Sequence, residues 1–156
     1  MPHHTYSGDY VAVVRAVGAR EFLTTAGLPA GHVLFAAAEG KVEEAGGRSL
    51  LPIGSGDPES GDLYGVDCAS GEVVYFSPVD RTVSHVSASP RRFDELLRVF
   101  ESEISAVGDD PEDVAERLRL RIETVDPTAL DDDPGFWVDV LFDVANGDYA
   151  DEPSER

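Results

Sequence analysis

Two β-rich runs joined by a short glycine-containing segment constrain the fold more than any other feature of this sequence. The runs are Leu63–Val66 and Val73–Phe76, and Gly71 lies between them. This pattern predicts a β-hairpin, because glycine readily adopts the positive φ that a tight turn needs. A third β-rich run, Thr82–Val86, follows a proline and an aspartate that mark another turn. The stretch therefore predicts an antiparallel meander of three strands.

A strongly amphipathic helix is predicted directly behind the meander, from Pro90 to about Val107. Ser89 is a natural N-cap, and Pro90 suits the first helical position, where a backbone N–H is not needed. The apolar residues recur at helical spacing and form one stripe: Phe93, Leu96, Leu97, Phe100, Ile104 and Val107. We expect the core of the protein to form between this stripe and the meander.

Two further helices are predicted to begin with an acidic residue followed by proline. Asp110-Pro111 opens a helix that runs to about Val125, and Asp133-Pro134 opens a last helix that ends at Asn146-Gly147. The inward residues of the two helices are Val114, Leu118, Ile122 and Val125, and Phe136, Trp137, Val140, Leu141 and Val144. Acidic residues at helix N-termini complement the helix dipole, so part of the acidic excess has a structural explanation.

The first third of the chain predicts one helix and two strands. Residues 9–26 show helical spacing of apolar residues, with Gly18 as a point where the helix can break. The apolar run 32–38 and the run 49–53 are predicted strands. Pro52 places the second of these strands at a sheet edge or near a strand end, because proline cannot donate a hydrogen bond to a neighbouring strand.

Together these elements predict an α+β fold. We expect a curved, mostly antiparallel sheet of about five or six strands, with helices packed around it. With 156 residues, of which 42% are hydrophobic, the chain is long enough to bury a core without metal or disulfide support. We expect a single domain over residues 1–147, followed by an acidic flexible tail over residues 148–156.

Acidic residues dominate the charge, and they are distributed unevenly. The net charge is −19; residues 1–100 hold 13 acids and 8 bases, and residues 101–156 hold 18 acids and 4 bases. One interpretation is that the acids only keep the protein soluble. The other is that their field attracts a basic partner and accelerates its association. Both interpretations disfavour direct binding to nucleic acid, because its phosphates would be repelled.

The sequence carries no membrane or secretory signal. No apolar run approaches the roughly 18 residues that span a bilayer. The first ten residues lack the basic and apolar regions of a signal peptide. Cys68 is the single cysteine, which excludes an internal disulfide and suits a reducing compartment. We therefore expect a cytoplasmic protein without a membrane partner.

Four acidic residues near the hairpin entrance are the candidates for metal binding or acid–base catalysis: Asp57, Glu59, Asp62 and Asp67. Their spacing does not match a calcium-binding loop. The glycine-rich segment 54–61 has no lysine and lacks the phosphate-binding pattern of nucleotide-binding loops. We expect no metal, no cofactor and no catalytic set, and therefore a protein that is not an enzyme.

The remaining chemically distinctive residues favour structural roles. The four histidines show no paired metal-ligand spacing, and we expect His85 to be half-buried and hydrogen-bonded. Cys68 has no second cysteine nearby, which favours a buried, inert thiol. Trp137 is predicted in the core. The triplet Asp131-Asp132-Asp133 is either a solvated lead-in to the last helix or part of a partner-binding surface.

Three segments, in order, carry a resemblance to a known family. They are Phe22-Leu23 with Gly27-Leu28-Pro29, then Leu51–Gly54 with Val66-Asp67 and Gly71–Val74, and then the helix that contains Phe93. This order is similar to that of the SUKH superfamily, in particular the subgroup-four SUKH immunity proteins of bacteria. The resemblance covers roughly residues 10–107. It implies a mixed α+β domain whose relatives in polymorphic toxin systems bind and neutralise a cognate toxin, often a nuclease or a nucleic-acid deaminase.

The resemblance carries over no catalytic residues, since the family has no catalytic set. The leading hypothesis is therefore an immunity protein that binds a cognate, basic protein toxin. Its expected partner-binding residues are Asp131, Asp132, Asp133, Asp57, Glu59 and Asp62. One alternative is a general interaction or regulatory scaffold without a toxin partner. A third hypothesis, a hydrolase, requires at least two of the hairpin-entrance carboxylates to converge in a cleft.

Overall fold

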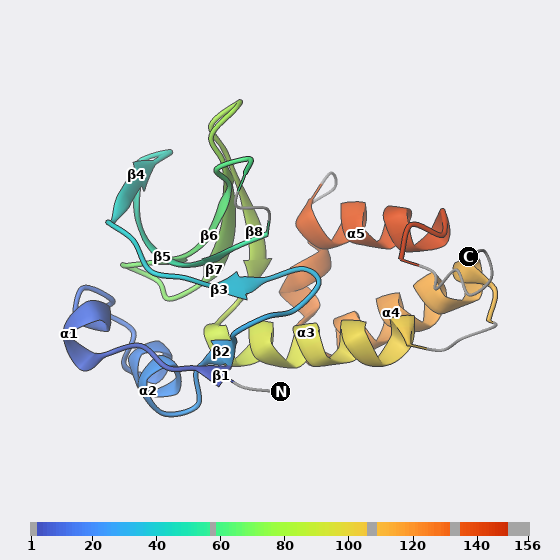
Figure 1. Ribbon diagram of the computed structural model, residues 1–156, viewed down its shortest axis with the longest axis horizontal. Helices are drawn as coiled ribbons and strands as arrows, with labels where there is room; N and C mark the ends of the chain where they lie inside the picture. The colour runs from blue at the N-terminus through green and yellow to red at the C-terminus, as the bar shows by residue number, and fades with distance from the viewer. Residues whose placement is uncertain (1–2, 57–58, 106–108, 132–134, 150–156) are drawn as a thin grey trace.

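A computed structural model describes residues 3–56, 59–105, 109–131 and 135–149 (Figure 1). Within them the fold is mixed α+β, as predicted. The strands are β1 (His3–His4), β2 (Leu28–Pro29), β3 (Ala36–Ala37), β4 (Glu43–Ala45), β5 (Arg48–Ser55), β6 (Leu63–Asp67), β7 (Val73–Ser77) and β8 (Thr82–Ser87). The helices are α1 (Gly8–Val11), α2 (Val17–Thr25), α3 (Pro90–Ile104), α4 (Pro111–Val125), the 3-10 helix η1 (Pro127–Leu130) and α5 (Phe136–Ala145).

The main sheet has six strands, all paired antiparallel. Its order is β3-β5-β6-β7-β8, and β4 also pairs with β5, so β8 forms one edge and β3 and β4 share the other. The predicted meander is confirmed, since Tyr64 of β6 lies opposite Tyr75 of β7, which lies opposite Ser84 of β8. Strands β1 and β2 form a separate antiparallel pair that ties the N-terminal segment to the end of α2.

The first two helices after the meander, α3 and α4, begin where the capping residues predicted. The Ser89 hydroxyl accepts a hydrogen bond from the backbone N–H of Arg92, and Pro90 opens α3. Helix α4 starts at Pro111 and ends at Val125. In Figure 1, α3, α4 and α5 gather on one side of the sheet. None of the described helices is long and apolar enough to cross a membrane.

Most of the core lies between the sheet and these helices, as expected from the apolar stripe of α3. Its largest fully buried side chains include those of Phe35, Tyr64, Phe93, Phe100 and Trp137. A smaller apolar cluster lies apart from it on the opposite side of β5 and β7, formed by Ala45, Leu50, Val74 and Phe76. The predicted core position of Trp137 is confirmed: the side chain is fully buried, and its indole N–H donates to the carbonyl of Val86, 3.0 Å away. This bond fixes α5 to β8.

The single helix predicted over residues 9–26 is wrong in one respect. The chain forms two helices, α1 and α2, and the break precedes Gly18 rather than falling on it. The intervening backbone has tertiary partners: the Arg15 N–H donates to the carbonyl of Cys68. The Arg20 guanidinium donates to the carbonyls of Val14 and Arg15. These bonds satisfy backbone groups of the non-helical segment between α1 and α2, which the local periodicity of apolar residues does not reveal.

The strand predicted over residues 32–38 shrinks to the two residues of β3. Before it, the His32 ring and carbonyl accept the N–H groups of Leu34 and Phe35, which makes a turn. Pro52 is not at a strand end, but on the side of β5 away from β6 it lies in a gap between the residues that pair with β4 (48–50) and those that pair with β3 (54–55). It lies within β5, where the register towards β6 shifts, and its carbonyl accepts the hydroxyl of Tyr10. The Tyr10 hydroxyl satisfies the Pro52 carbonyl, and the register shift marks the place where regular pairing with β6 is interrupted.

The last helix begins at Phe136 with Gly135 as N-cap, later than the predicted start; Asp133 and Pro134 lie outside the described residues. Its predicted end is confirmed, since Gly147 takes a φ of 85° directly after the C-cap. Beyond it, the half-buried ring of Tyr149 packs edge-on against Phe100, with 5.1 Å between ring centroids. Residues 150–156 of the predicted acidic tail lie outside the described residues.

Candidate partner-binding surface

The acidic residues predicted to bind a partner occupy different environments. Asp131 is exposed at the end of η1, and Glu59 is exposed in the segment before β6. Asp62 is only 8% exposed, and its carboxylate accepts a hydrogen bond from the hydroxyl of Tyr75. The other three predicted residues, Asp57, Asp132 and Asp133, lie outside the described residues.

The hydrolase hypothesis requires two carboxylates in one cleft, and Asp62 and Asp67 do not meet this requirement as a pair. Asp62 precedes β6 and Asp67 ends it, so the two residues are separated by about 16 Å at the usual rise of a strand. Asp67 has a turn-forming role, because its Oδ1 accepts the N–H groups of Ala69 and Ser70 at 2.8 and 3.2 Å. No group of three or more His, Cys, Asp or Glu residues that would suit a metal ion occurs among the described residues.

His85 and Cys68 have structural environments, as predicted. His85 is half-buried, with Nδ1 2.7 Å from a Glu72 carboxylate oxygen and Nε2 2.9 Å from the hydroxyl of Thr128. That hydroxyl is also 2.6 Å from Asp126, which caps η1, so this chain of hydrogen bonds joins β8 to η1. Cys68 is 7% exposed, and burial raises the pKa of its thiol, with smaller contributions from Asp67 and Glu44.

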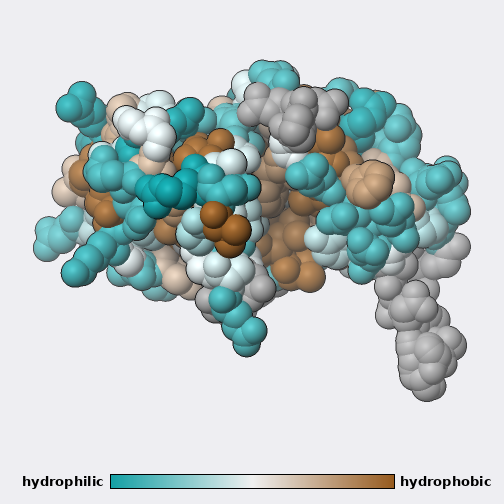
Figure 2. All heavy atoms as spheres, turned by 90° about the horizontal axis from the view of Figure 1, so that it is seen from above, coloured by the Kyte–Doolittle hydropathy of each residue, from teal (hydrophilic) through white to brown (hydrophobic). Residues whose placement is uncertain are grey.

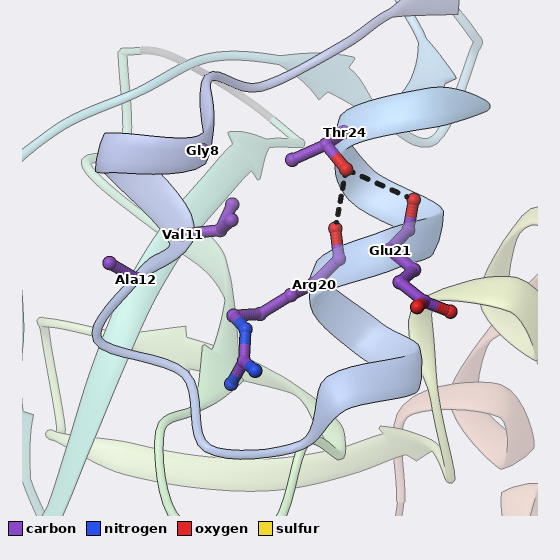
Figure 3. Close-up of a pocket in the computed structure, with 6 residues that line it drawn as sticks. All are labelled: Gly8, Val11, Ala12, Arg20, Glu21 and Thr24. Carbon is purple, nitrogen blue, oxygen red and sulfur yellow. Dashed lines mark hydrogen bonds between the residues drawn. The ribbon is translucent and has the colours of Figure 1, made fainter.

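A hollow between α1 and α2 offers no catalytic set (Figure 3). The Thr24 hydroxyl that faces it donates to backbone carbonyls of its own helix. The Arg20 guanidinium holds the loop that joins α1 to α2. A second hollow lies between the starts of α2 and α3, and Glu21 and Arg91 are the charged side chains along it. Polar groups in these hollows support local structure.

The C-terminal part of the chain has an unbalanced negative charge. No lysine, arginine or histidine occurs in residues 122–155. The same stretch contains 11 acids: Glu123, Asp126, Asp131, Asp132, Asp133, Asp139, Asp143, Asp148, Asp151, Glu152 and Glu155. Because α5 lies inside this stretch, no cationic side chain of the helix itself or of its flanking segments can neutralise its acids.

The outward face of α5 concentrates this charge around an exposed aromatic side chain. We define this face by Asp139, Phe142, Asp143 and the C-cap Asn146, which share one side of the helix through spacings of three and four. Phe142 is 67% exposed. Figure 2 looks onto the side of the molecule that carries α5, where hydrophilic residues cover most of the surface and hydrophobic ones show in small areas. Neither aspartate of this face forms an ion pair with a described residue.

The pKa of a neighbouring tyrosine, Tyr149, is affected by these acids. Burial raises the pKa of Tyr149, and the charges of Asp143 and Asp148 raise it further. An increase of this sign means that negative charge near the phenol disfavours its ionisation. The end of α5 therefore presents a negative potential.

Phe142 is the residue of this surface that the sequence reasoning did not single out. A signal was present: Phe142 falls outside the predicted inward set of the last helix, three residues after Asp139 and directly before Asp143. A large apolar residue on the polar side of an amphipathic helix is a candidate contact residue.

The family resemblance is confirmed by comparison with protein families. The model of the SUKH-4 immunity protein family matches residues 7–143, which extends the similarity beyond the meander and α3 to α4 and α5. Searches of curated proteins and of solved structures each found no match. Because the family model covers most of the chain, from before α1 into α5, this protein belongs to the SUKH-4 immunity protein family.

Proposed function

We propose that this protein neutralises a cognate toxin that acts on nucleic acid, a nuclease or a nucleic-acid deaminase, by covering its basic substrate-binding surface. Membership of an immunity family supplies the general function, protection against a toxin. The kind of toxin is inferred from one observation: residues 122–155 carry 11 acids and no base.

Charge complementarity supports this choice of partner. An enzyme that binds nucleic acid presents lysine and arginine side chains to phosphates. A protein with a net charge of −19 attracts such a surface over long distances and increases the rate of encounter. Its carboxylates then occupy the positions of the phosphates, so the inhibitor competes with the substrate.

A binding role also agrees with the arrangement of the polar side chains. Asp62 is bonded to Tyr75, Asp67 to a turn, and His85 to Glu72 and Thr128. Members of immunity families are generally not enzymes. Protection by simple occlusion requires no group of this protein to react.

Co-expression with a candidate toxin domain encoded by a neighbouring gene tests the proposal. Growth of the host is expected to be restored by this protein, and the purified pair is expected to bind more weakly as the salt concentration rises. Inhibition of the toxin should be competitive with nucleic acid. Absence of rescue would overturn the proposal in favour of a scaffold role. Rescue with an affinity that does not depend on salt would overturn the claim that the protein binds a basic surface of the toxin.

A further inference from the structure

Phe142 stands out among the exposed apolar side chains of the described residues. The large apolar side chains that are most exposed are Val79 (89%), Phe142 (67%), Val33 (61%), Val17 (56%) and Leu120 (50%). Phe142 is the one aromatic residue in this group. Ordering an aromatic side chain at an interface costs little conformational entropy and buries a large area, and aromatic residues are enriched among contacts that dominate binding energy.

The backbone holds Phe142 in a fixed outward position. Its helix is anchored from below by Trp137, which is fully buried and bonded to Val86. Val140 and Val144, on the same underside, are also buried. The side chain of Phe142 therefore projects from a rigid element, so binding would require no reorganisation of the backbone.

The immediate surroundings of Phe142 are acidic. Asp139 lies one helical turn before it and Asp143 directly follows it, and neither has a cationic partner among the described residues. An apolar centre ringed by charged groups is the arrangement of a binding hot spot with a polar rim. Because this rim is negatively charged, the complementary rim of the partner should carry lysine and arginine.

From this arrangement we infer that the outward face of α5 is the toxin-binding surface, with Phe142 inserted into an apolar pocket whose rim is basic. This inference rests on the function proposed above and assigns it a location and an anchor residue. A second copy of this chain is a poor occupant, because it would bring Asp139 and Asp143 against the same residues of its partner and add the repulsion of two net charges of −19.

The test compares two single substitutions in the full chain, Phe142→Ala and Leu120→Ala. Leu120 is the matched control, since it is an exposed apolar residue of the adjacent helix α4. The probe is the toxin domain against which this protein protects in the co-expression test. Loss of a hot-spot contact by Phe142→Ala should weaken binding at least about thirtyfold, mainly through faster dissociation. Leu120→Ala should change affinity less than about twofold.

A second variant, Asp139→Asn with Asp143→Asn, tests the acidic rim. It should slow association and reduce the dependence of the association rate on salt, while dissociation changes less than with Phe142→Ala. Circular dichroism confirms that each variant is folded. Because this double variant keeps the aromatic anchor, it remains informative if Phe142→Ala is unstable.

The outcomes separate failure of the inference from failure of the proposed function. If the unsubstituted protein neither rescues growth nor binds the toxin domain, both fail. If the unsubstituted protein rescues growth and binds the toxin domain, and Phe142→Ala binds equally well, the α5 face is excluded as the binding surface while the proposed function stands. Sedimentation of the unsubstituted protein adds one further outcome: a dimer that Phe142→Ala dissociates, without loss of toxin binding, would assign the face to a second copy and overturn the inference.

Discussion

Helices α4 and α5 pack against each other, yet they differ in charge pairing: the acids around α4 form ion pairs with arginines, and those on the outward face of α5 form none with a described residue. The outward faces of both helices combine acidic residues with one exposed apolar side chain, Leu120 on α4 and Phe142 on α5. On α4, three arginines pair with the surrounding acids. These pairs are Arg117 with Glu103 and Asp109, Arg119 with Glu116 and Glu123, and Arg121 with Glu103. On α5, Asp139 and Asp143 have no such pairs among the described residues.

The difference separates acids that form ion pairs within the fold from acids that form none among the described residues. Exposed ion pairs along a helix stabilise it slightly, a gain that the acids of α5 do not have. Asp143 also lies in the last turn of α5, where the helix dipole disfavours negative charge. The paired acids around α4 therefore stabilise the fold, whereas Asp143 costs α5 stability, a cost that the proposed binding of a basic partner would explain.

The largest expected effect separates the two sides of α5. Trp137→Ala removes a fully buried indole and its bond to Val86, and should lower the free energy of unfolding by about 3–5 kcal/mol. Phe142→Ala, on the opposite side, should change it by less than about 0.5 kcal/mol. Urea unfolding followed by circular dichroism gives both values. Similar losses in the two variants would show that Phe142 belongs to the core rather than to a binding face.

The next effect tests whether the pairs around α4 stabilise the fold. Glu103, on α3, accepts hydrogen bonds from Arg117 and Arg121 at 3.1 and 2.9 Å, and its side chain is 13% exposed. Glu103→Gln removes the charge but keeps the size, and should lower the free energy of unfolding by about 1–2 kcal/mol. Asp139→Asn, which loses no ion pair among the described residues and only the interaction of a first-turn acid with the helix dipole, is the control on α5. Equal effects of the two substitutions would contradict the contrast between the faces.

The same residue predicts a pH dependence. Partial burial favours the neutral acid, but hydrogen bonds from Arg121 and Arg117 outweigh it and lower the pKa of Glu103. The resulting stabilisation is fully present above the pKa of the unfolded chain and disappears as the pH falls through the lower folded-state value. Thermal unfolding measured across this acidic range should show a shallower loss of stability in Glu103→Gln. If stability falls equally steeply with pH in both proteins, the pairs of Glu103 with arginine do not cause the pH dependence.

The smallest effect has the opposite sign. Asp143→Asn removes an acid from the last turn of α5, so the variant should be more stable than the unsubstituted protein by about 0.3–1 kcal/mol at low salt. Added salt should reduce this difference, because it screens exposed charges. Urea unfolding at two salt concentrations measures it. A loss of stability instead would reveal a favourable role of Asp143 within the fold.

Sequence reasoning predicted best where local chemistry decides the structure. Ser89-Pro90 and Asp110-Pro111 set the starts of α3 and α4, and Gly71, with a φ of 85°, lies in the hairpin turn between β6 and β7. It failed where distant partners decide. The break between α1 and α2 depends on bonds to Cys68 and from Arg20, and neither is visible in local periodicity.

For the candidate surface, the sequence predicted the acidic character but not which residues form it. The acidic C-terminal part and the inward stripe of the last helix follow from charge and spacing. The separation of paired from unpaired acids does not, because it depends on where the arginines of α4 point. Asp62 illustrates this limit: it was predicted among the partner-binding residues, whereas the fold buries it beside Tyr75.

The buried state of Cys68 has a practical consequence for spectroscopy. The chain has one cysteine, it is 7% exposed, and its raised pKa keeps the reactive thiolate scarce at neutral pH. A thiol introduced at the exposed Asn146, at the end of α5, would therefore react with a maleimide dye far faster than the native one. The native chain thus already serves as a background for attaching a single fluorophore beside Phe142, with no second substitution needed in the core.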